Sequence, residues 1–368
     1  MSVATGSITA EPAPLPFVAP PSEPARLPVV VGGLGATVPA TRITNYDLAD
    51  VVETTHEWIV ERTGIVERRV VSADQATSDL GSSAARAALT DAGLSGADVD
   101  LLIVTTSTPD HPLPSTAALL ARDLGVTGTV FDLNAACAGW VFGLVTGAAM
   151  MTAMGGRAAL IIGAEVMSKW MDPADRATLP LFGDGAAAAV LLPARSGAGL
   201  IAWDLGVDGT AAGLLQVPAG GSRQPMTTEA LARGDQYMKM EGREVFRRAV
   251  RAVEASCRKT LTSAGVSASD VSLFIPHQAN ARIVDAILPR LGLTPERTVV
   301  NIDRYGNTSA ASIPLALCEA AAAGRLSEGD LVLVAGFGAG MTWATALIRW
   351  SYAGSGPAQP TVLAPSRA

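Results

Sequence analysis

Short apolar runs alternate with longer segments of helical spacing along most of the chain. An unbroken apolar run of strand length is typical of a strand that is buried on both faces of a sheet. Such runs predict strands at residues 129–133, 158–164, 298–302 and 331–335. Helices are predicted at residues 82–92, 138–154, 244–264 and 309–323. Because strands and helices alternate, the pattern indicates an α/β protein with covered sheets.

The order of these segments repeats once. Residues 93–103 (GLSGADVDLLI) recur as residues 265–275 (GVSASDVSLFI), 172 positions later. The Gly-Arg pair before the strand at 158–164 recurs 168 positions later. Self-similarity of this kind predicts two similar halves. An intermediate offset of 170 aligns Cys137 with Asn307, so we expect the two helix starts to meet near the centre.

The two ends of the chain differ from this repeated body. Residues 1–28 contain seven prolines, and residues 353–368 have a similar loop-like composition, so both are predicted to be disordered tails. The body divides into an N-terminal half at 29–198 and a C-terminal half at 199–352. The first tail lacks the basic and apolar regions of a signal peptide, and the apolar runs are too short to span a bilayer. We therefore expect no membrane segment.

Composition and charge narrow the kinds of function. The chain has 368 residues, 49% of them hydrophobic and 17% charged, with a net charge of −7. It can bury a large core, and its acidic balance argues against a broad nucleic-acid-binding surface. The three cysteines include no C-x-x-C pair, which argues against a disulfide framework or a metal site. The same cysteine usage favours a reducing, cytoplasmic setting.

Three residues at predicted strand ends are candidates for chemistry. Cys137 lies among small residues at the start of an apolar helix, where the backbone N–H groups and the helix dipole favour a thiolate. The alternative is an ordinary buried cysteine. His277 is either a site residue or a structural histidine, and Asn307 is either a site residue or a turn or N-cap residue. Their shared position at strand ends favours a site, because open α/β sheets bind ligands there.

Six ordered motifs give the chain a specific resemblance. They lie at residues 56–65 (HEWIVERTGI), 135–139 (AACAG), 182–187 (FGDGAA), 276–280 (PHQAN), 306–314 (GNTSAASIP) and 336–340 (GFGAG). With these motifs the sequence resembles the β-ketoacyl-acyl carrier protein (ACP) synthase III family of the thiolase superfamily. The resemblance implies a five-layered αβαβα thiolase-like fold with two similar halves, and a homodimer. The internal repeat independently supports such a fold.

The resemblance also implies a reaction. Cys137 would take the acyl group of an acyl-CoA, and His277 and Asn307 would stabilise the enolate formed when malonyl-ACP loses CO2. The backbone N–H groups of Cys137 and Ala339 would form the oxyanion hole, although the family often has glycine at the second position. No cofactor is implied, because the CoA thioester is a substrate.

Two other functions remain open at this point. Some relatives transfer an acyl group to an alcohol or amine without decarboxylation, and Asn307 argues against this because such relatives tend to depart from the triad. A catalytically silent subunit is also conceivable, and the intact triad argues against it.

The resemblance further implies residues that bind the substrates. The CoA and pantetheine contacts would be Trp58 on the adenine, Arg62, Arg176 and Arg282 on the phosphates, and Asn280 on the pantetheine. The acyl pocket would include Leu113, Phe182, Met240 and Phe246. Leu113 stands where the family often has a phenylalanine supplied by the partner subunit, which favours a starter larger than acetyl. The sequence leaves open whether the pathway makes fatty acids or polyketides.

One predicted helix carries a basic stripe that can be interpreted in two ways. Arg247, Arg251 and Arg258 lie on one side of the helix predicted at 244–264. The stripe is either a docking surface for an acidic carrier protein or a solvated helix face.

Overall fold

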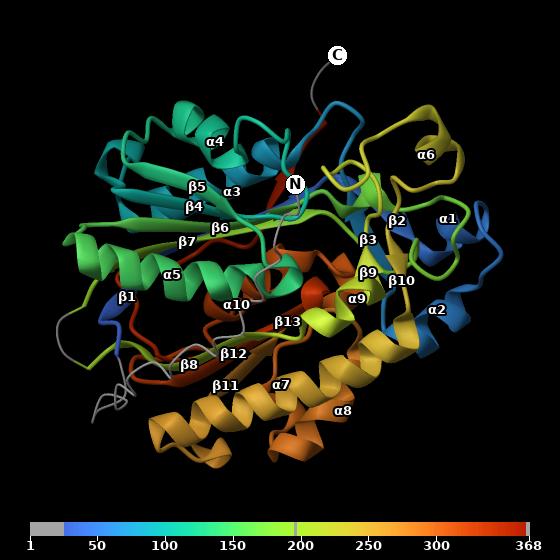
Figure 1. The fold of residues 1–368 in the computed structure, drawn as a ribbon. Helices are drawn as coiled ribbons and strands as arrows, with labels where there is room; N and C mark the ends of the chain where they lie inside the picture. Colours follow the sequence, from blue (N-terminus) through green and yellow to red (C-terminus); the bar gives the residue numbers. More distant parts are fainter. Residues whose placement is uncertain (1–25, 195–196, 366–368) are drawn as a thin grey trace, which may run out of the picture.

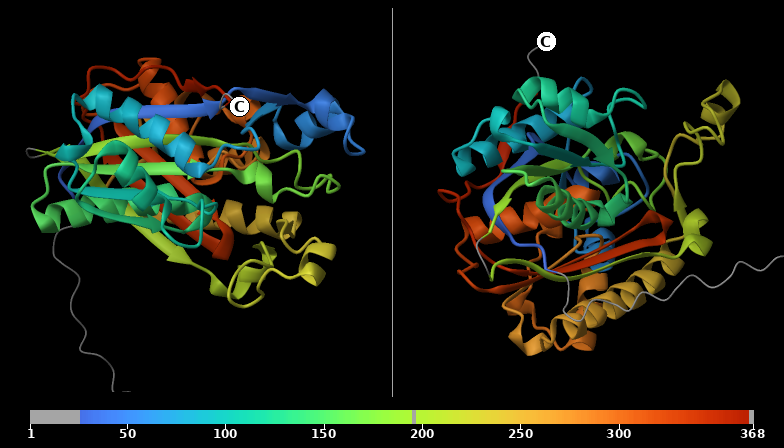
Figure 2. Two further views of the ribbon diagram at one scale, coloured as in Figure 1. Left: turned by 90° about the horizontal axis from the view of Figure 1, so that it is seen from above. Right: turned by 60° about the vertical axis from the view of Figure 1, so that its left-hand side comes forward.

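The protein is described by a computed structural model that covers residues 26–194 and 197–365. Two sheets alternate with three layers of helices (Figure 1), and the same layers are seen from two further sides in Figure 2. Two helices lie between the sheets, and one pair of helices covers the outer face of each sheet. The predicted five-layered α/β fold is therefore confirmed. Most of the predicted tail at 1–28 lies outside the described residues.

The first sheet has six strands in the order β14-β1-β7-β6-β4-β5. Its members are β1 (Val29–Pro39), β4 (Leu101–Thr105), β5 (Thr129–Leu133), β6 (Ala159–Glu165), β7 (Gly185–Pro193) and β14 (Thr361–Leu363). Strands β4, β5 and β6 are parallel, so their carboxyl ends meet at one edge of the sheet. Strand β7 runs antiparallel to its neighbours β1 and β6.

The second sheet has four strands in the order β11-β12-β13-β8. Its members are β8 (Gly199–Val207), β11 (Leu273–Pro276), β12 (Leu331–Gly338) and β13 (Thr342–Arg349). Strands β11 and β12 are parallel, as β4 and β6 are in the first sheet. Two short ribbons lie outside the sheets and pair β2 (Thr41–Thr44) with β3 (Glu67–Val70), and β9 (Leu215–Gln216) with β10 (Lys239–Met240).

The helices divide by layer. The central pair is α5 (Gly139–Met154) and α10 (Ser312–Ala322), the first sheet is covered by α3 (Thr77–Ala92) and α4 (Thr116–Leu124), and the second by α7 (Gly242–Ala264) and α8 (Ala281–Leu291). Smaller helices are α1 (Asn45–Ala49), α2 (His56–Thr63), α6 (Thr228–Ala232) and α9 (Ile302–Tyr305). Short 3-10 turns are η1 (Gly96–Asp98), η2 (Ala136–Ala138), η3 (Met167–Trp170), η4 (Gly209–Leu214), η5 (Ala268–Asp270), η6 (Pro295–Arg297), η7 (Ser309–Ala311) and η8 (Ala339–Met341).

The central helix α5 explains one ambiguous signal in the sequence. Within the described residues, the segment Ala136–Met154 is long and apolar enough to cross a membrane by length and composition alone. In the structure α5 contacts β4 and β6 on one side and β12 and β13 on the other. A helix that is apolar on all sides is typical of such a position between two sheets.

The repeat is visible in matching local structure at the recurring segments. Helices α3 and α7 both end at a left-handed glycine, Gly93 and Gly265. Each helix is followed by a 3-10 turn with a serine–aspartate capping box, η1 in one half and η5 in the other. The strands β4 and β11 then begin at equivalent positions, so the offset of 172 describes this part of both halves.

The offset at the two central helices differs from the one expected. Asn134 accepts a hydrogen bond from the Ala136 N–H at 3.1 Å, and Asn307 accepts one from the Ser309 N–H at 2.8 Å. Both Ala136 and Ser309 have a φ of 49°, and the offset between these matching turns is 173. The expected alignment of Cys137 with Asn307 is therefore wrong, since Asn134 is the equivalent of Asn307. Helix α10 has 11 residues against 16 in α5, which explains why the offset then falls to 168.

Three of the four predicted strands are present as β5, β6 and β12, but the strand at 298–302 is not. Only Thr298 forms an isolated bridge, to Phe274, and α9 begins at Ile302. The Gln278 side chain donates to the Val299 carbonyl at 3.0 Å and accepts from the Asn301 N–H at 3.1 Å. A side chain thus replaces the strand partner that this segment would need.

The segment after residue 352 is also ordered where a tail was predicted. Strand β14 pairs in parallel with β1 at the edge of the first sheet. Asp91 holds the preceding turn, since its carboxylate accepts from the Ser355 hydroxyl at 3.1 Å and the Gly356 N–H at 2.9 Å. The Gln75 amide donates to the Ala364 carbonyl at 2.8 Å. The prediction of a disordered tail at 353–368 is therefore wrong for residues 353–365, because a free sheet edge can pair with even a short extended segment.

Candidate active site

One cavity of about 570 Å³ lies between the two halves. Most of the residues predicted from the motifs line it, namely Trp58, Arg62, Cys137, Arg176, Phe182, Met240, Phe246, His277, Asn280, Arg282 and Asn307. Cys137, His277 and Asn307 come from three separate segments, each just beyond a strand or a turn at the carboxyl edge of a sheet. Each is 6 to 7% exposed, so only a small part of each side chain is accessible from the cavity.

Cys137 lies in the middle of η2, the turn that leads into α5. Strand β12 passes so close that a Cβ on Gly338 would lie 2.6 Å from the Cys137 nitrogen, and one on Gly336 would lie 2.9 Å from the Cα of Ala138. These glycines therefore let β12 reach the backbone of the cysteine turn. Two of the three GFGAG glycines, Gly336 and Gly338, thus serve a close approach between the two halves.

The Cys137 sulfur is not a thiolate in the resting protein. Burial raises the pKa of the Cys137 thiol to about 12, and the negative charge of Glu165 acts in the same direction. A hydrogen bond with the Ser309 side chain acts in the opposite direction. The sequence-based expectation that the helix start would favour a thiolate is thus outweighed by desolvation.

His277 follows β11 and is held in one orientation. Its Nδ1 lies 2.5 Å from the Ser312 hydroxyl oxygen, and that oxygen also accepts from the Gln278 N–H at 3.4 Å. Donation of the Ser312 proton to Nδ1 is compatible with both contacts, and in that tautomer Nε2 carries the imidazole proton. Burial lowers the pKa of His277 to about 3, so the ring is neutral at physiological pH. A neutral N–H donor results.

Asn307 lies in the turn that precedes η7. Its Oδ1 accepts the Ser309 N–H at 2.8 Å, and its backbone N–H donates to the Leu181 carbonyl at 2.8 Å. Because the oxygen is engaged by the turn, the carboxamide nitrogen is the group left to donate into the cavity. His277 and Asn307 thus supply two uncharged donors next to a thiol, a combination that suits a developing anion.

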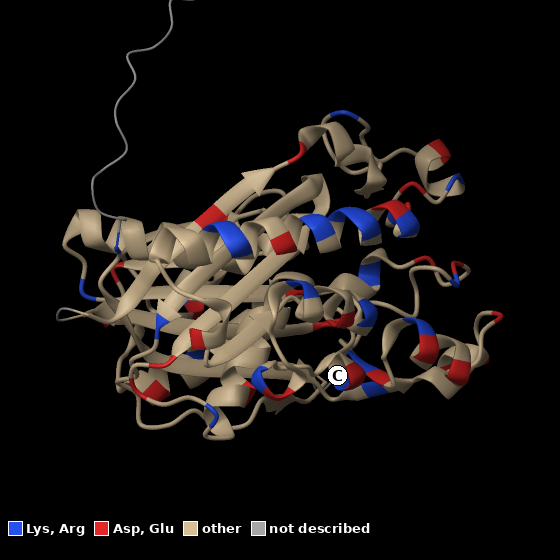
Figure 3. Cartoon of the chain, turned by 90° about the horizontal axis from the view of Figure 1, so that it is seen from below, with Lys and Arg blue, Asp and Glu red and all other residues tan. Residues whose placement is uncertain are grey.

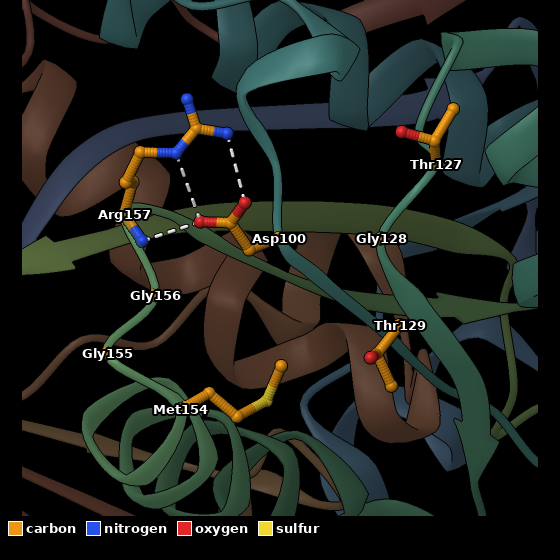
Figure 4. Close-up of a pocket in the computed structure, with 8 residues that line it drawn as sticks. All are labelled: Asp100, Thr127, Gly128, Thr129, Met154, Gly155, Gly156 and Arg157. Atoms are coloured by element: carbon orange, nitrogen blue, oxygen red, sulfur yellow. Dashed lines mark hydrogen bonds and ion pairs between the residues drawn. The ribbon is translucent and has the colours of Figure 1, made fainter.

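A second hollow, of about 640 Å³, shares no lining residue with this cavity, and Figure 4 shows the residues that form it. It is formed at the amino ends of β4, β5 and β6, around Asp100 and Arg157. Arg157 donates to Asp100 from its backbone at 2.6 Å and from its guanidinium at 3.0 Å, which closes the loop before β6. The charged groups of this hollow, Asp100 and Arg157, are paired with each other, and none of its lining residues is a cysteine or histidine.

Comparison with known proteins agrees with this geometry. Family models for the 3-oxoacyl-[ACP] synthase III and its C-terminal part match residues 131–209 and 261–350. The β-ketoacyl-[ACP] synthase III of Rhodopirellula baltica is 47% identical over 340 residues, which cover 88% of this chain and 98% of the relative. This chain belongs to the β-ketoacyl-ACP synthase III family.

Solved structures of the family superpose on the whole body of the chain. The 3-oxoacyl-[ACP] synthase III of Aquifex aeolicus has a TM-score of 0.81 at 39% identity, covering 88% of this chain and 100% of the relative. The priming β-ketosynthase of the R1128 polyketide pathway has a TM-score of 0.81 at 36% identity, covering 89% and 98%. A synthase III and a priming β-ketosynthase of a polyketide pathway therefore share this architecture.

The predicted CoA-binding residues of this synthase III cluster at the mouth of the cavity. The Trp58 ring carries the guanidinium of Arg62 at 4.8 Å and that of Arg176 at 4.7 Å from its centroid. Asn280 caps α8 by accepting from the Arg282 N–H at 2.9 Å, and its amide donates to the Arg62 carbonyl at 3.0 Å. The structure thus places the predicted residues together and adds a role for Asn280 in joining α8 to α2.

Two predicted residues do not line the cavity. Leu113 is 86% exposed and lies on the loop after β4. Ala339 follows the lining residue Gly338 and begins η8, and it packs at the edge of the apolar cluster around Met167 and Phe182. The remaining predicted acyl-pocket residues do face the synthase III cavity.

Two residues beside Cys137 were not among the predicted site residues. Glu165 ends β6 and is fully buried, and Ser309 opens η7 with its hydroxyl donating to the Glu165 carboxylate at 2.8 Å. The predicted strand ended at Ala164, one residue too early. The sequence signal that could have identified Glu165 is an acidic residue directly after an apolar run. The strand before Cys137, β5, ends at the same edge of the sheet.

Proposed function

We propose that this chain condenses an acyl-CoA with malonyl-ACP, losing CO2 and giving a β-ketoacyl thioester, and that Cys137, His277 and Asn307 carry out the reaction. Family membership supports the reaction type. The observation that supports the residues is their meeting in one cavity, a nucleophile from one half and two neutral donors from the other. Enzymes of this family use the CoA thioester as a substrate and need no cofactor.

In the first half-reaction the Cys137 sulfur attacks the thioester carbonyl and CoA leaves, giving an acyl-enzyme. Because burial keeps the resting thiol protonated, the proton must leave the sulfur during acyl transfer. The oxyanion of the tetrahedral intermediate would accept from the backbone N–H groups of Cys137 and Ala339. The close approach of Gly338 to the Cys137 nitrogen supports this pairing, because Ala339 supplies the next backbone N–H after the end of β12.

In the second half-reaction the malonyl carboxylate leaves as CO2 and the thioester oxygen becomes an enolate. His277 Nε2–H and the Asn307 amide would donate to that oxygen, and each such donor is typically worth about 3 kcal/mol of barrier. The enolate carbon then attacks the acyl-cysteine carbonyl, forms the new C–C bond and releases the Cys137 sulfur. The neutrality of His277 suits a donor that must not neutralise the enolate before it attacks.

A labelled malonyl-ACP tests this reaction. With the free carboxyl labelled, we expect equal amounts of labelled CO2 and β-ketoacyl-ACP, the latter identified by mass. Transfer of the acyl group to an alcohol or amine with no release of CO2 would instead identify a non-decarboxylating acyltransferase. The Cys137→Ala variant is the control and should show no acyl-enzyme mass after incubation with acyl-CoA alone.

The mouth residues would receive CoA. An adenine ring stacked on Trp58 must replace one of the two guanidinium groups that now cover its faces. Arg62, Arg176 or Arg282 would then bind the CoA phosphates, for which an arginine fork is well suited. Asn280 would contact the pantetheine only through atoms that its capping bonds leave free.

We propose a homodimer in which the partner subunit completes the acyl pocket. Strand β5 is an edge strand of the first sheet, and its last four residues are only partly buried within one chain. An uncovered edge can pair with the same edge of a second copy. The nearly full exposure of Leu113 supports a contact with another chain. Sedimentation at micromolar concentration should give a dimer, and a stable monomer would contradict this assembly.

The starter is proposed to be larger than acetyl. Phe182, Met240 and Phe246 line the cavity, and the leucine that a partner subunit would supply from position 113 would close its end less tightly than a phenylalanine. Turnover of acetyl-, isobutyryl- and hexanoyl-CoA with malonyl-ACP measures the preference. A clear preference for acetyl-CoA would refute the proposal, and product masses would help assign the enzyme to a fatty-acid or polyketide pathway.

Helix α7 is proposed as the docking surface for the acidic carrier protein, in a reducing cytoplasm. Lys and Arg gather along this helix at the lower face of the molecule (Figure 3). Arg247 and Arg258 pair with Glu244 and Glu254, whereas no ion pair of the described residues involves Arg251. The Arg251→Glu variant should raise the KM for malonyl-ACP and leave acylation by acyl-CoA unchanged. Unchanged kinetics with malonyl-ACP would dismiss the surface.

A further inference from the structure

Glu165 is a buried carboxyl group for which the mechanism above gives no role. It is fully buried, and no ion pair of the described residues reaches it. Its oxygens accept hydrogen bonds from a set of hydroxyl and backbone N–H groups instead, namely Thr106 Oγ1 (3.3 Å), Ser107 N (3.1 Å to each oxygen), Thr108 Oγ1 (2.8 Å), Ser309 Oγ (2.8 Å) and Ala310 N (3.4 Å). Backbone N–H groups can only donate, so this shell is built for the ionised carboxylate. A buried charge without a cation is expensive, so an ionised group at this position calls for a role beyond packing.

Ser309 connects this carboxylate to the nucleophile. Its hydroxyl donates to Glu165 at 2.8 Å, and η7, which it opens, packs against η2, which carries Cys137, so that the Ser309 side chain holds down the pKa of the Cys137 thiol. A hydroxyl group donates once and accepts as well, so it can reverse the direction of both bonds without moving its oxygen. Its backbone is held at a φ of 49°, uncommon for a residue other than glycine, by the bond to Asn307. A strained position kept between two polar groups is typical of a functional site.

We propose that Glu165 holds the Cys137 proton for as long as the enzyme carries the acyl group, with Ser309 as the bridge. This rests on the proposed function, because it concerns the acyl-enzyme of that reaction. Glu165 acts through Ser309 and does not touch the substrate. Cys137 is the titratable group that faces it, and the other groups in its shell are hydroxyls and backbone N–H groups.

The protons balance over the two half-reactions. As the sulfur–carbon bond to the acyl group forms, the thiol proton passes to Ser309 Oγ and the Ser309 proton passes to Glu165. The carbon–sulfur bond to CoA breaks, and the CoA thiolate takes a proton from water. When the enolate later displaces the acyl group, the Cys137 thiolate recovers the stored proton from Glu165 through Ser309.

The relay also neutralises Glu165 before the enolate forms, when a second negative charge nearby would oppose the reaction. Burial raises the pKa of Glu165, and a charged Glu165 raises the pKa of Cys137, so each group resists ionisation while the other is charged. In the acyl-enzyme Glu165 would be neutral. The enolate of malonyl-ACP then forms beside a neutral carboxylic acid and not beside a second anion.

Proton uptake during acylation tests the relay in the wild-type chain. Acyl-CoA is mixed with the enzyme in weak buffer near neutral pH without malonyl-ACP, while an indicator dye follows protons; free CoA is measured by chromatography in acid-quenched samples from a parallel reaction, so that its detection releases no proton into the mixture. We expect about one proton taken up for each CoA released, because the CoA thiolate is protonated by solvent at this pH. Later addition of malonyl-ACP should cause no further uptake as CO2 leaves.

The variants separate the relay from a structural role. Glu165→Gln should acylate about 10²-fold more slowly and take up no proton for each CoA that it releases. Asp184→Asn changes another buried carboxyl with hydroxyl and N–H partners, and it should keep the uptake per CoA. CoA release from the wild type without proton uptake would overturn the relay alone. No CoA release and no acyl-enzyme mass would overturn the proposed function.

Discussion

Replacing Asn307 by aspartate tests whether this side chain acts only on the enolate. The turn should survive, because one carboxylate oxygen can still accept the Ser309 N–H that now lies 2.8 Å from Oδ1. The second oxygen then replaces the amide donor in the cavity. Loss of one such donor is worth about 3 kcal/mol, or about 10²-fold in rate, and the added negative charge acts in the same direction.

The assay separates the two half-reactions. CoA release in a single turnover reports acylation, and labelled CO2 reports decarboxylation. We expect Asn307→Asp to slow CO2 release at least 10²-fold and to leave CoA release within a few-fold of wild type. The control is Asn134→Asp, which alters the matching turn of the other half and places no acid among the residues that line the cavity. An equal loss in both half-reactions for Asn307→Asp would refute the assigned role.

Three further outcomes follow from the geometry. Gly338→Ala places a Cβ 2.6 Å from the Cys137 nitrogen, so we expect a loss of about 1–3 kcal/mol in the free energy of unfolding together with slower acylation, measured by denaturant titration and CoA release. Trp58→Ala should raise the KM for acyl-CoA with little change in kcat, and an unchanged KM would remove Trp58 from the CoA site. Burial lowers the pKa of His277 to about 3 from 6.5, so stability present above pH 6.5 should fall as the pH drops toward 3, and His277→Gln should flatten that fall in urea titrations at a series of pH values.

The sequence predicted the layers and the reacting trio because both depend on local patterns. The strands at 129–133 and 331–335 are apolar runs that any buried sheet requires, and the short motifs around Cys137, His277 and Asn307 each sit directly after such a run or at a turn into a helix. Patterns of this kind need no knowledge of distant contacts.

What the sequence could not supply depends on contacts between distant segments. The run at 298–302 is apolar enough for a strand, but the Gln278 side chain takes its hydrogen bonds. The relation of Glu165 to Ser309 spans 144 positions and carries no spacing signal. Burial of Cys137 depends on β12 as well as on its own helix. The expectation of a thiolate considered only the helix start, whereas burial has the larger effect on the pKa of the thiol.

The position of α5 has a consequence for synthesis of the chain on the ribosome. This apolar helix is complete by residue 154, but β12 and β13, which cover its second side, follow after residue 330. Strand β14, which pairs with β1, emerges later still. One side of the apolar helix α5 therefore stays exposed until nearly the whole polypeptide has been made. We expect the incomplete N-terminal half to bind a chaperone during synthesis. For the same reason, cutting the chain between the halves should yield fragments that aggregate and not two independent domains.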